Sequence, residues 1–366
     1  MKTQLIIFGI TGDLSRRKLL PALDAIMSKT DEDIEIVGVS RRDVDAADLT
    51  KAWPVLAGKT SIFTMSLDEL GEYQRLAKHL GALPEGVQRF YYLSVPPGAA
   101  TTIADFLGLA GLSSSHEKIL FEKPFGYDYV SALELIERTS RYFDESQLFR
   151  IDHFMAKEIA REVIALRSEA EGRHRHWGVS SVSRVEVVAH ETLGVEGRGA
   201  FYEQTGAIRD VVQGHLMQLL SLVLMEPPKE FEALPTARLR ALEQLEPVKP
   251  ENCVTSQYDG YKEEVGTLDS ATETYARLTL YSEDPRWEGV PLILETGKKM
   301  PEKRTYIRVV YRDGTEDVFD ESKVVYEDNA RLKDAYEHVL LAAIGNERAM
   351  FTTSDEVLAS WRVLTL

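Results

Sequence analysis

The first fourteen residues constrain the fold of this chain more than any other segment. Leu5 to Phe8 form a continuous apolar run that ends at Gly9, a pattern typical of a strand buried on both faces of a parallel sheet. Residues 9–14 read Gly-Ile-Thr-Gly-Asp-Leu, and a helical pattern follows. A strand, a glycine turn and a helix in this order are typical of dinucleotide-binding folds, because the turn's backbone can approach a pyrophosphate at the helix N-terminus. The match to Gly-x-Gly-x-x-Gly is imperfect, since Thr11 and Leu14 occupy two of the glycine positions.

The residues after the second predicted strand, Ile34 to Val39, indicate which dinucleotide binds. Folds that select NAD usually have an acidic residue here, which binds the ribose 2′-hydroxyl. This chain has Ser40-Arg41-Arg42, and two guanidinium groups suit a 2′-phosphate. We therefore expect NADP as the cofactor, with NAD as the alternative. A solvated basic turn before a helix capped by Asp43 is the competing interpretation.

Two further strands, Phe90 to Val95 and Lys118 to Phe121, extend the predicted parallel sheet. The second is followed by Glu122-Lys123-Pro124, which places an acid and a lysine where open α/β sheets bind their ligands. Lys123 is therefore a site candidate, although an exposed loop lysine is the commoner case. The peptide bond before Pro124 can be cis, which the sequence does not decide.

A polar cluster follows the next strand-like run, Gln147 to Ile151. Asp152, His153 and Lys157 are interleaved with apolar residues, and this mixture indicates partly buried charges that are paired or bound to a ligand. A helix start capped by Asp152, with the lysine in solvent, is the simpler interpretation.

Beyond this cluster the alternation of strands and helices ends. Strands with the period of a half-buried antiparallel sheet are predicted at Ser183 to His190, Thr272 to Tyr281, Val290 to Glu295 and Tyr306 to Tyr311. A long helix, Ala207 to Met225, carries Asp210 and His215 five positions apart, near enough to line one cleft. A lone helix histidine is more often a core residue. Two closing helices are expected at Leu332 to Ile344 and Ser354 to Val363, and Glu226 to Pro250 is the most loop-like insert.

These patterns predict an α/β plus α+β fold. Residues 1–150 form an N-terminal Rossmann-like, doubly wound parallel sheet that binds the dinucleotide. Residues 151–366 form a substrate-binding α+β domain with a mainly antiparallel, reduced sheet and helices.

The composition excludes several classes of partner. Lys and Arg number 43 against 59 Asp and Glu, and the net charge of −16 argues against nucleic acid or an anionic membrane. An anionic ligand therefore needs a local basic pocket. A single cysteine, Cys253, excludes an internal disulfide and a cysteine-rich metal site. With no signal peptide expected, and no apolar stretch near the ~20 residues of a membrane span, we expect a cytoplasmic location.

Eight motifs, in order along almost the whole chain, resemble those of the glucose-6-phosphate dehydrogenase family. They are Gly9 to Lys18, Glu122 to Gly126, Arg150 to Glu158, Gly194 to Gly199, Ile208 to His215, Gly297-Lys298, Asp334 to Glu337 and Ser354 to Glu356. The resemblance implies oxidation of β-D-glucose 6-phosphate at C1 to 6-phosphogluconolactone in the pentose phosphate pathway, with NADP⁺ taking the hydride.

The same resemblance implies roles for individual residues. His215 matches the general base, Asp152 the carboxylate that orients it, and Lys123 a further catalytic-site residue that also contacts the cofactor. His153 and Lys157 match the phosphate ligands, with Lys303 as an additional cation. Contacts to the sugar hydroxyls are implied for Lys123, Glu191, Asp210 and Lys298. The cofactor turn and the 2′-phosphate contact match Gly9, Thr11, Gly12, Asp13, Leu14, Arg41 and Arg42. No metal is implied, because hydride transfer needs a base, positioning and the nicotinamide.

The chain departs from the family pattern at several positions. Phe154 and Ala156 stand where the motif has tyrosine and glycine. The tyrosine hydroxyl donates to the substrate phosphate, and a charge-assisted hydrogen bond contributes roughly 1.5–3 kcal/mol, so we expect about ten- to a hundredfold weaker binding without compensation. Glu295 stands where some members have an arginine for a second, structural NADP, and we predict no such site. The chain is also short between Tyr311 and Asp334 and after Leu366, so a homodimer through the family's sheet is an open prediction.

Three rival interpretations remain. In the first, the chain is a related dehydrogenase that acts on a different sugar or sugar phosphate. In the second, it is a non-catalytic homologue that binds the cofactor. In the third, it is another Rossmann oxidoreductase that has Glu-Lys-Pro at a strand end. Retention of His215, Asp152 and Lys123 together argues against the second, because a binding module needs no pair of base and carboxylate.

Overall fold

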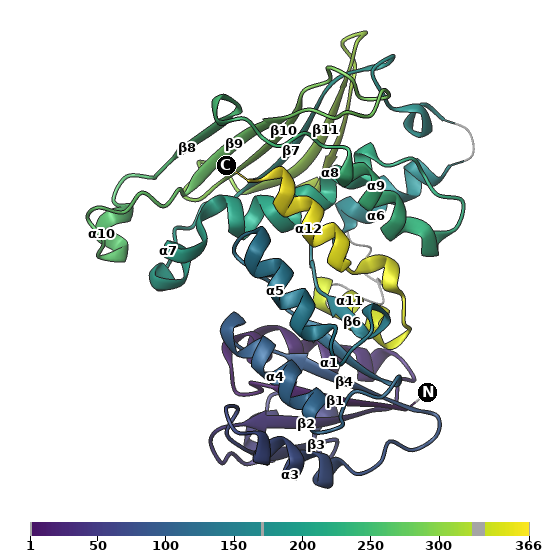
Figure 1. Cartoon of the computed structure of the whole chain (residues 1–366), viewed down its shortest axis with the longest axis vertical. Coiled ribbons are helices and arrows are strands. Elements are labelled where there is room, and N and C mark those ends of the chain that lie inside the picture. Colours follow the sequence, from purple (N-terminus) through teal and green to yellow (C-terminus); the bar gives the residue numbers. More distant parts are fainter. Residues whose placement is uncertain (1, 170–171, 324–333, 366) are drawn as a thin grey trace. The chain divides into compact units, whose positions relative to one another are not determined.

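The computed structural model describes residues 2–169, 172–323 and 334–365, which divide into two compact units (Figure 1). Unit 1 contains the described residues 2–125, 131–153 and 334–354. Unit 2 contains the described residues 126–130, 154–323 and 355–365. The assignment of cofactor binding to residues 1–150 and of substrate binding to residues 151–366 stays a prediction.

Unit 1 is built on a six-stranded parallel sheet in the order β3-β2-β1-β4-β5-β6. Its strands are β1 (Lys2–Phe8), β2 (Ile34–Ser40), β3 (Thr60–Thr64), β4 (Val87–Leu93), β5 (Glu117–Phe121) and β6 (Leu148–Arg150). Leu5 to Phe8 are all buried, as the continuous apolar run predicts. This strand order is that of the doubly wound dinucleotide-binding fold, in which the direction of winding reverses between β1 and β4. The prediction of a Rossmann-like sheet is confirmed.

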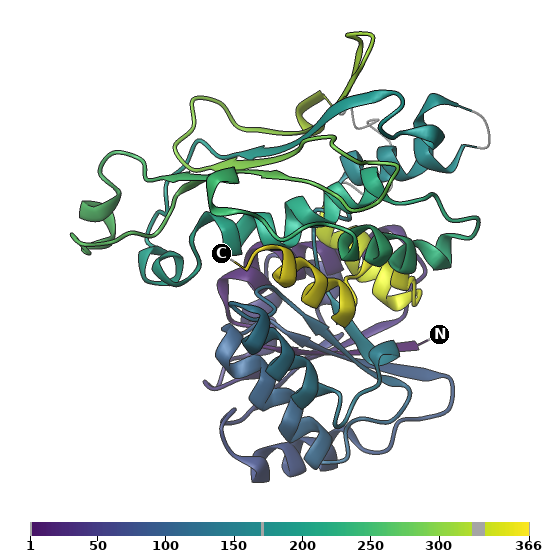
Figure 2. The same ribbon diagram turned by 45° about the horizontal axis from the view of Figure 1, so that its top comes forward.

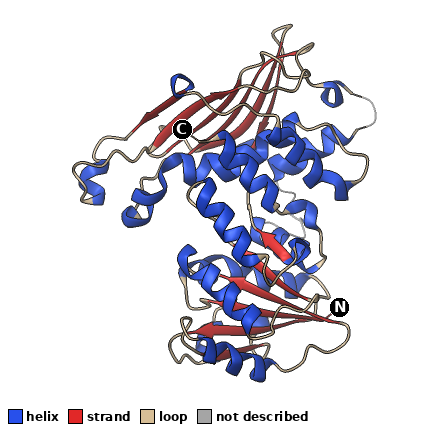
Figure 3. Ribbon diagram, in the orientation of Figure 1, coloured by secondary structure: helices blue, strands red, loops and turns tan. Residues whose placement is uncertain are grey.

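Helices cover both faces of this sheet (Figure 3). They are the π-helix η1 (Ser15–Leu19), α1 (Leu20–Lys29), α2 (Ala46–Thr50), α3 (Leu70–Leu80), α4 (Pro97–Leu109), α5 (Tyr129–Thr139) and α11 (Ala335–Ile344), with short 3-10 turns η2 (Pro54–Leu56), η3 (Glu145–Gln147) and η9 (Arg348–Met350). Right-handed crossovers put α1 on one face and α3 and α4 on the other. The late helix α11 packs against α1, and ion pairs Lys18–Asp334 (3.0 Å) and Lys29–Glu337 (3.3 Å) support this contact.

Unit 2 is built on a second six-stranded sheet in the order β12-β11-β7-β10-β9-β8. Its strands are β7 (Val182–His190), β8 (Cys253–Ser256), β9 (Tyr275–Leu280), β10 (Leu292–Gly297), β11 (Arg304–Tyr311) and β12 (Glu316–Asp320). Strands β7 and β10 run parallel, and the other neighbouring pairs run antiparallel. The predicted mainly antiparallel sheet is confirmed.

Helices of unit 2 gather on one face of this sheet, as the rotated view in Figure 2 shows. They are α6 (Glu158–Ser168), α7 (Gly199–Ala207), the π-helix η5 (Ile208–Leu216), α8 (Met217–Leu224), α9 (Leu234–Glu243), α10 (Tyr261–Val265) and α12 (Ser354–Val363), with 3-10 turns η4 (Arg173–His176), η6 (Phe231–Ala233), η7 (Pro250–Asn252) and η8 (Glu321–Lys323). All side chains of α8 are buried, so this helix forms the centre of the unit's core. No helix within the described ranges is both long and apolar enough to cross a membrane.

Some local predictions were wrong. The segment Glu226 to Pro250 contains the helix α9 and is not simply a loop. Asp45, not Asp43, caps α2, because its side chain accepts hydrogen bonds from the backbone of Ala47 and Asp48. Helix α6 begins at Glu158 after Lys157, so Asp152 is not its cap. The first two residues of the helix expected from Leu332 lie outside the described residues.

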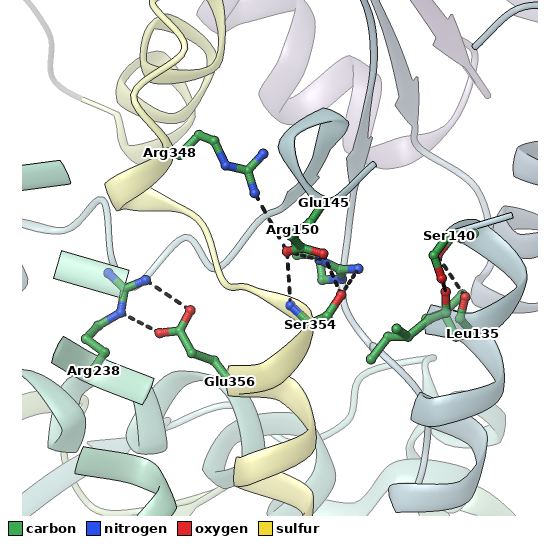
Figure 4. Close-up of polar contacts among 10 residues, drawn as sticks. Leu135, Ser140, Glu145, Arg150, Arg238, Arg348, Ser354 and Glu356 are labelled. Carbon is green, nitrogen blue, oxygen red and sulfur yellow. Dashed lines mark hydrogen bonds and ion pairs between the residues drawn. The ribbon is translucent and has the colours of Figure 1, made fainter. Parts of the chain in front are cut away.

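Two motif residues have structural partners within their own units (Figure 4). In unit 1 the buried guanidinium of Arg150 donates to Glu145 (3.0 Å) and to the Ser354 hydroxyl (2.7 Å). In unit 2 Arg238 and Glu356, both fully buried, form an ion pair at 2.7 Å that joins α9 to α12. The motifs that contain Arg150 and Glu356 therefore contribute to the fold.

Candidate active site

The glycine turn after β1 lies at the point where the winding of the unit 1 sheet reverses. Gly9 has φ +77°, and a Cβ atom added there would lie 2.2 Å from the carbonyl oxygen of Ser94, which follows β4. The Ser15 hydroxyl donates to the Gly9 carbonyl oxygen (3.0 Å) and lies 3.1 Å from the Ser94 hydroxyl. Only glycine allows this approach, because any side chain would push the ends of β1 and β4 apart.

The rest of the turn contains one backbone hydrogen bond and an exposed ion pair. The amide of Gly12 donates to the Gly9 carbonyl oxygen at 2.8 Å. Thr11 and Leu14 are partly exposed, and Asp13 is exposed and pairs with Arg17 at 2.7 Å. The helix continues as the π-helix η1, a form that occurs frequently at functional sites.

The arginine pair stands at the carboxyl end of β2. Arg41 and Arg42 are both exposed, and the buried Ser40 hydroxyl accepts a hydrogen bond from the Arg42 backbone amide at 3.1 Å. Neither guanidinium forms an ion pair with another described residue. Two cationic groups at this strand end therefore have their hydrogen-bond donors available to an anion.

The carboxyl end of β5 carries Glu122 and Lys123, and the peptide bond between Lys123 and Pro124 is cis. Glu122 accepts hydrogen bonds from the hydroxyls of Tyr92, at the end of β4, and Tyr336, at the start of α11. Burial raises the pKa of Glu122 to about 7, and the two hydroxyls act in the opposite direction. Lys123 thus projects from a strand end whose neighbouring carboxyl group is held by two tyrosines.

Asp152 and His153 follow β6, the neighbour of β5. The amide of Ile151 donates to the Phe121 carbonyl oxygen at 2.9 Å, so the two strand ends lie side by side. Asp152 is buried, and its charge contributes to raising the pKa of Glu122. The His153 ring lies parallel to the Tyr336 ring, with centroids 6.3 Å apart. Unit 1 therefore brings Lys123, Asp152 and His153 to one edge of its sheet.

In unit 2 the Phe154 ring lies between two candidate residues. It stacks on the His215 ring with centroids 4.1 Å apart and an angle of 9° between the planes. The Lys157 ammonium lies 3.6 Å from the centroid of the same ring, a cation–π contact. The phenylalanine thus fixes the plane of the His215 imidazole and the position of Lys157.

Asp210 and His215 lie on the π-helix η5. In an α-helix, positions five apart point in well-separated directions, at 3.6 residues per turn. The i→i+5 hydrogen bonding of a π-helix instead brings such residues to the same side. The π-helical form therefore puts the Asp210 and His215 positions on a common side of the helix, which agrees with the expectation that both line one cleft.

Glu191 and Lys298 follow the two parallel strands β7 and β10. The Glu191 amide donates to the Gly297 carbonyl oxygen at 2.9 Å, and the two side chains form an ion pair. The Lys298 side chain is buried and its ammonium lies 5.1 Å from the Tyr202 ring, whereas half of the Glu191 side chain is exposed. Lys303 is exposed just before β11, which begins opposite His190 and hence at the same edge of the sheet.

The predicted site residues thus fall into two groups. Unit 1 contains the cofactor-turn residues, Arg41, Arg42, Lys123, Asp152 and His153. Unit 2 contains Lys157, Glu191, Asp210, His215, Lys298 and Lys303. The pairing of Asp152 with His215 joins residues of different units and stays a prediction.

Glu295 has partners of its own in unit 2. Its carboxylate binds His190 (3.0 Å) and Arg277, and these two contacts lower its pKa. The absence of a structural NADP site at this position stays a prediction.

The sequence interpretation missed Tyr92 and Tyr336 as neighbours of the site, and it noted Glu122 without a role. All three side chains come from segments far apart in the chain. The sequence feature that could have identified Tyr92 is its position near the end of a strand. Tyr92 and Glu122 lie at the carboxyl ends of adjacent parallel strands, which meet at one edge of the sheet.

Comparisons with known proteins identify relatives of this chain. The family model for the glucose-6-phosphate dehydrogenase NAD binding domain matches residues 6–162, and the model for the C-terminal domain matches residues 164–332. Glucose-6-phosphate 1-dehydrogenase 1 of Mycobacterium tuberculosis is 36% identical over 326 residues, which cover 84% of this chain and 69% of that protein.

Solved structures show the same similarity. Glucose-6-phosphate 1-dehydrogenase from Mycobacterium avium is 30% identical, with a TM-score of 0.86 over 99% of this chain and 90% of that one. A glucose-6-phosphate dehydrogenase in complex with its substrate glucose-6-phosphate is 25% identical, with the same TM-score and coverage.

The dinucleotide-binding sheet and the matching NAD binding domain define an NAD(P)-dependent dehydrogenase. More narrowly, the chain belongs to the glucose-6-phosphate dehydrogenase family, and the resemblance noted in the sequence is confirmed.

Proposed function

We propose that this chain oxidises glucose 6-phosphate at C1 to 6-phosphogluconolactone, with NADP⁺ as the hydride acceptor. The observation that carries the proposal is that the family's motif residues follow the carboxyl ends of parallel strands in both sheets. That edge is where open α/β sheets bind their ligands. Lys123, Asp152 and His153 stand there in unit 1, and Glu191 and Lys298 stand at the corresponding edge in unit 2.

The residues of unit 1 fit NADP. A Cβ at Gly9 would fill the space next to Ser94, and the following turn exposes backbone at the start of a helix, whose dipole favours phosphate. Arg41 and Arg42 would hold the 2′-phosphate, because both guanidinium groups are exposed and form no ion pair among the described residues. Bound NADP⁺ supplies the acceptor for the hydride that leaves C1.

His215 is the proposed general base that takes the proton of the C1 hydroxyl. An imidazole titrates near neutral pH, so it can accept this proton and release it in each cycle. The stacking of Phe154 holds the imidazole plane in a single orientation. Asp152 is the proposed carboxylate that orients the ring and stabilises its charged form.

Cations and polar groups are the proposed ligands of the substrate. His153 and Lys157 are the proposed phosphate ligands, with Lys303 as an additional cation. The proposed contacts to the sugar hydroxyls come from Lys123, Glu191, Asp210 and Lys298. The ion pair between Glu191 and Lys298 supports this assignment, because it orients a buried ammonium whose charge would otherwise be unfavourable.

The test is the growth of NADPH absorbance when the protein is mixed with glucose 6-phosphate and NADP⁺. Turnover that disappears in His215→Asn, with unchanged circular dichroism, supports the proposed base. Unchanged turnover in that variant contradicts the mechanism. Turnover with another sugar phosphate only would favour a related dehydrogenase of different specificity, and binding of NADP⁺ without any turnover would favour a non-catalytic homologue.

Phe154→Tyr tests the phosphate site separately. The new hydroxyl extends a ring already placed between His215 and Lys157, so it adds a donor without a new backbone conformation. We expect KM for glucose 6-phosphate to fall by about tenfold or more at similar kcat, the magnitude of a charge-assisted hydrogen bond. Phe231→Tyr, in an exposed ring of unit 2 outside the motifs, serves as the control for a general effect of an added hydroxyl.

Two further properties stay predictions. A homodimer through the family's sheet is an open prediction, because the chain is short in the region that supports that dimer, and light scattering on the purified protein measures the oligomeric state. A cytoplasmic location is expected from the composition and the single cysteine.

A further inference from the structure

Glu122 is a carboxyl group that the proposed reaction does not use, although it immediately precedes Lys123. It stands at the carboxyl end of β5 and accepts hydrogen bonds from two hydroxyls. The Tyr92 side chain is fully buried at the end of β4, and the Tyr336 side chain is buried at the start of α11. The carboxyl group therefore joins three segments that are remote in sequence and that meet at the proposed substrate edge of unit 1.

The charges around Glu122 come from each of the segments packed against it. Lys123 favours its ionised form, and Asp152, after β6, disfavours it. The tyrosine hydroxyls of β4 and α11 favour the ionised form as donors. Beyond Tyr336 lie the His153 ring, stacked at 6.3 Å, and the Lys18 ammonium, 6.0 Å from the tyrosine ring. Burial outweighs the favourable contacts, so the pKa of Glu122 rises to about 7.

The protonation state of Glu122 decides which way the tyrosine hydroxyls point. An ionised carboxylate is an acceptor only, so it orients the hydrogens of both hydroxyls toward itself. A protonated carboxyl group is also a donor, and it can direct its own hydrogen to one tyrosine oxygen. That tyrosine then no longer needs to donate to Glu122, and its contact with the carboxyl group becomes a weaker, neutral one. The Tyr336 ring stacks on His153, a proposed phosphate ligand, so Tyr336 connects Glu122 to that ligand.

We propose that Glu122 is a positioning residue for substrate binding. Its carboxylate is held between the hydroxyls of Tyr92 and Tyr336. In this position it fixes the strand end that carries Lys123 and the stack of Tyr336 on His153 in the arrangement that binds the sugar phosphate. This inference rests on the function proposed above, since it concerns the same site. Near neutral pH the site passes between a tighter form with ionised Glu122 and a looser form with protonated Glu122.

Glu122→Gln tests this assignment, because a glutamine amide is both donor and acceptor and cannot ionise. We expect the variant to bind glucose 6-phosphate at every pH with the affinity of the protonated wild type. The wild-type Kd, measured by titration calorimetry, should therefore approach that of the variant below pH 7 and be about two- to tenfold lower above it, the effect of one hydrogen bond. The pH dependence of kcat that arises from His215 should remain in the variant.

The chain offers a matched control in the same strand. Glu117, at the start of β5, accepts a hydrogen bond from the Tyr91 hydroxyl at 2.7 Å and pairs with Arg89 at 2.7 Å. Glu117→Gln therefore removes the charge of another Tyr–Glu pair, at the opposite end of the same strand. It should lower stability without changing the pH dependence of Kd. A pH dependence of Kd that persists unchanged in Glu122→Gln, or that is lost equally in Glu117→Gln, overturns the proposal.

Infrared titration gives a readout that needs no turnover. The carbonyl band of a protonated carboxyl group should disappear with a midpoint near pH 7 in the wild type and be absent in Glu122→Gln. Where Glu122→Gln fails to fold, Tyr92→Phe removes one donor, so the midpoint should move to higher pH; an unmoved midpoint overturns the proposal. A wild type that binds the sugar phosphate with this pH dependence but forms no NADPH would contradict the proposed reaction and leave the role of Glu122 supported.

Discussion

Replacement of Gly9 by alanine separates two costs that usually occur together. The first is conformational: φ is +77°, and an L-residue in this region costs about 1–2 kcal/mol. The second is steric, because the new Cβ would lie 2.2 Å from the Ser94 carbonyl oxygen, where 3.4 Å is an ordinary contact. Backbone atoms of β1 or β4 must therefore move by about 1 Å, and Ser15 and Ser94 lose the geometry of their hydrogen bonds.

Gly58 is the matched control for this experiment. Its φ is +76°, but a Cβ there would meet no atom within 4 Å. Gly58→Ala should therefore lower the free energy of unfolding by about 1–2 kcal/mol and leave NADPH affinity unchanged. Gly9→Ala should lower the free energy of unfolding by about 2 kcal/mol more than the control does, because one or two hydrogen bonds are weakened and each contributes about 1 kcal/mol.

The assays are urea unfolding, followed by circular dichroism, and NADPH binding, followed by fluorescence. For Gly9→Ala we expect a lower unfolding midpoint and at least about tenfold weaker NADPH binding. Equal losses of stability in the two variants would show that the contact with Ser94 imposes no cost. Unchanged NADPH affinity in Gly9→Ala would refute the assignment of this turn to the cofactor.

Three other predictions follow from individual contacts. The double variant Arg41→Ala/Arg42→Ala should bind NADP⁺ about ten- to a hundredfold more weakly while binding of NAD⁺ changes little, as measured by equilibrium titration of each cofactor. Arg238→Met should lower the free energy of unfolding by about 3–5 kcal/mol because Glu356 is left buried without its partner, and Arg238→Met/Glu356→Leu should recover much of the loss in urea unfolding. The pKa of Glu122 is about 7 in the folded chain and 4.5 in its reference state, so the folded chain binds an extra proton between these values and its stability falls as pH rises through them. Between these two pH values, the free energy of unfolding of the wild type should fall by on the order of 3 kcal/mol relative to that of Glu122→Gln, as measured by chemical unfolding. If the free energies of the two proteins change with pH in parallel, the pKa assignment is contradicted.

Hydrophobic patterns predicted the central strands well and the edge strands poorly. The β1 strand is apolar on both faces and stands in the middle of its sheet, so its sequence alone identifies it. The β3, β8 and β12 strands were not predicted. Each lies at an edge, where fewer side chains need to be buried, so no continuous apolar run marks them.

The helix α9 was missed for a different reason. One of its buried positions is Arg238, and a hydrophobic pattern predicts that an arginine is exposed to solvent. Its burial depends on Glu356, 118 positions later, which supplies the compensating charge. A local pattern cannot contain such a partner. The sequence pattern does not reveal the π-helical form of η5 either. This form changes the side of the helix on which Asp210 and His215 lie, but it does not change the apolar content of the segment.

The sequence predicted which candidate site residues lie together where the direction of the strands was known. It did not predict this where the direction of the strands was unknown. In unit 1 the direction follows from the alternation of strands and helices, so Lys123 and Asp152 could be placed at one edge from the sequence. In unit 2 the period-two pattern of β7 indicates only that one face is buried, and it does not distinguish a parallel from an antiparallel neighbour.

The direction of β7 relative to β10 is what brings Glu191 and Lys298 together. In an antiparallel pair, the residues that follow the two strands lie at opposite ends of the sheet. Among the described strands of unit 2, β7 and β10 form the one parallel pair, in register from Val185 opposite Leu292 to His190 opposite Gly297. The next residue of each strand is a charged one, and the two side chains form an ion pair across 107 positions of sequence. The mixed character of this sheet therefore creates, inside a mainly antiparallel domain, an edge at which two parallel strands end side by side, as the strands of the Rossmann sheet do throughout.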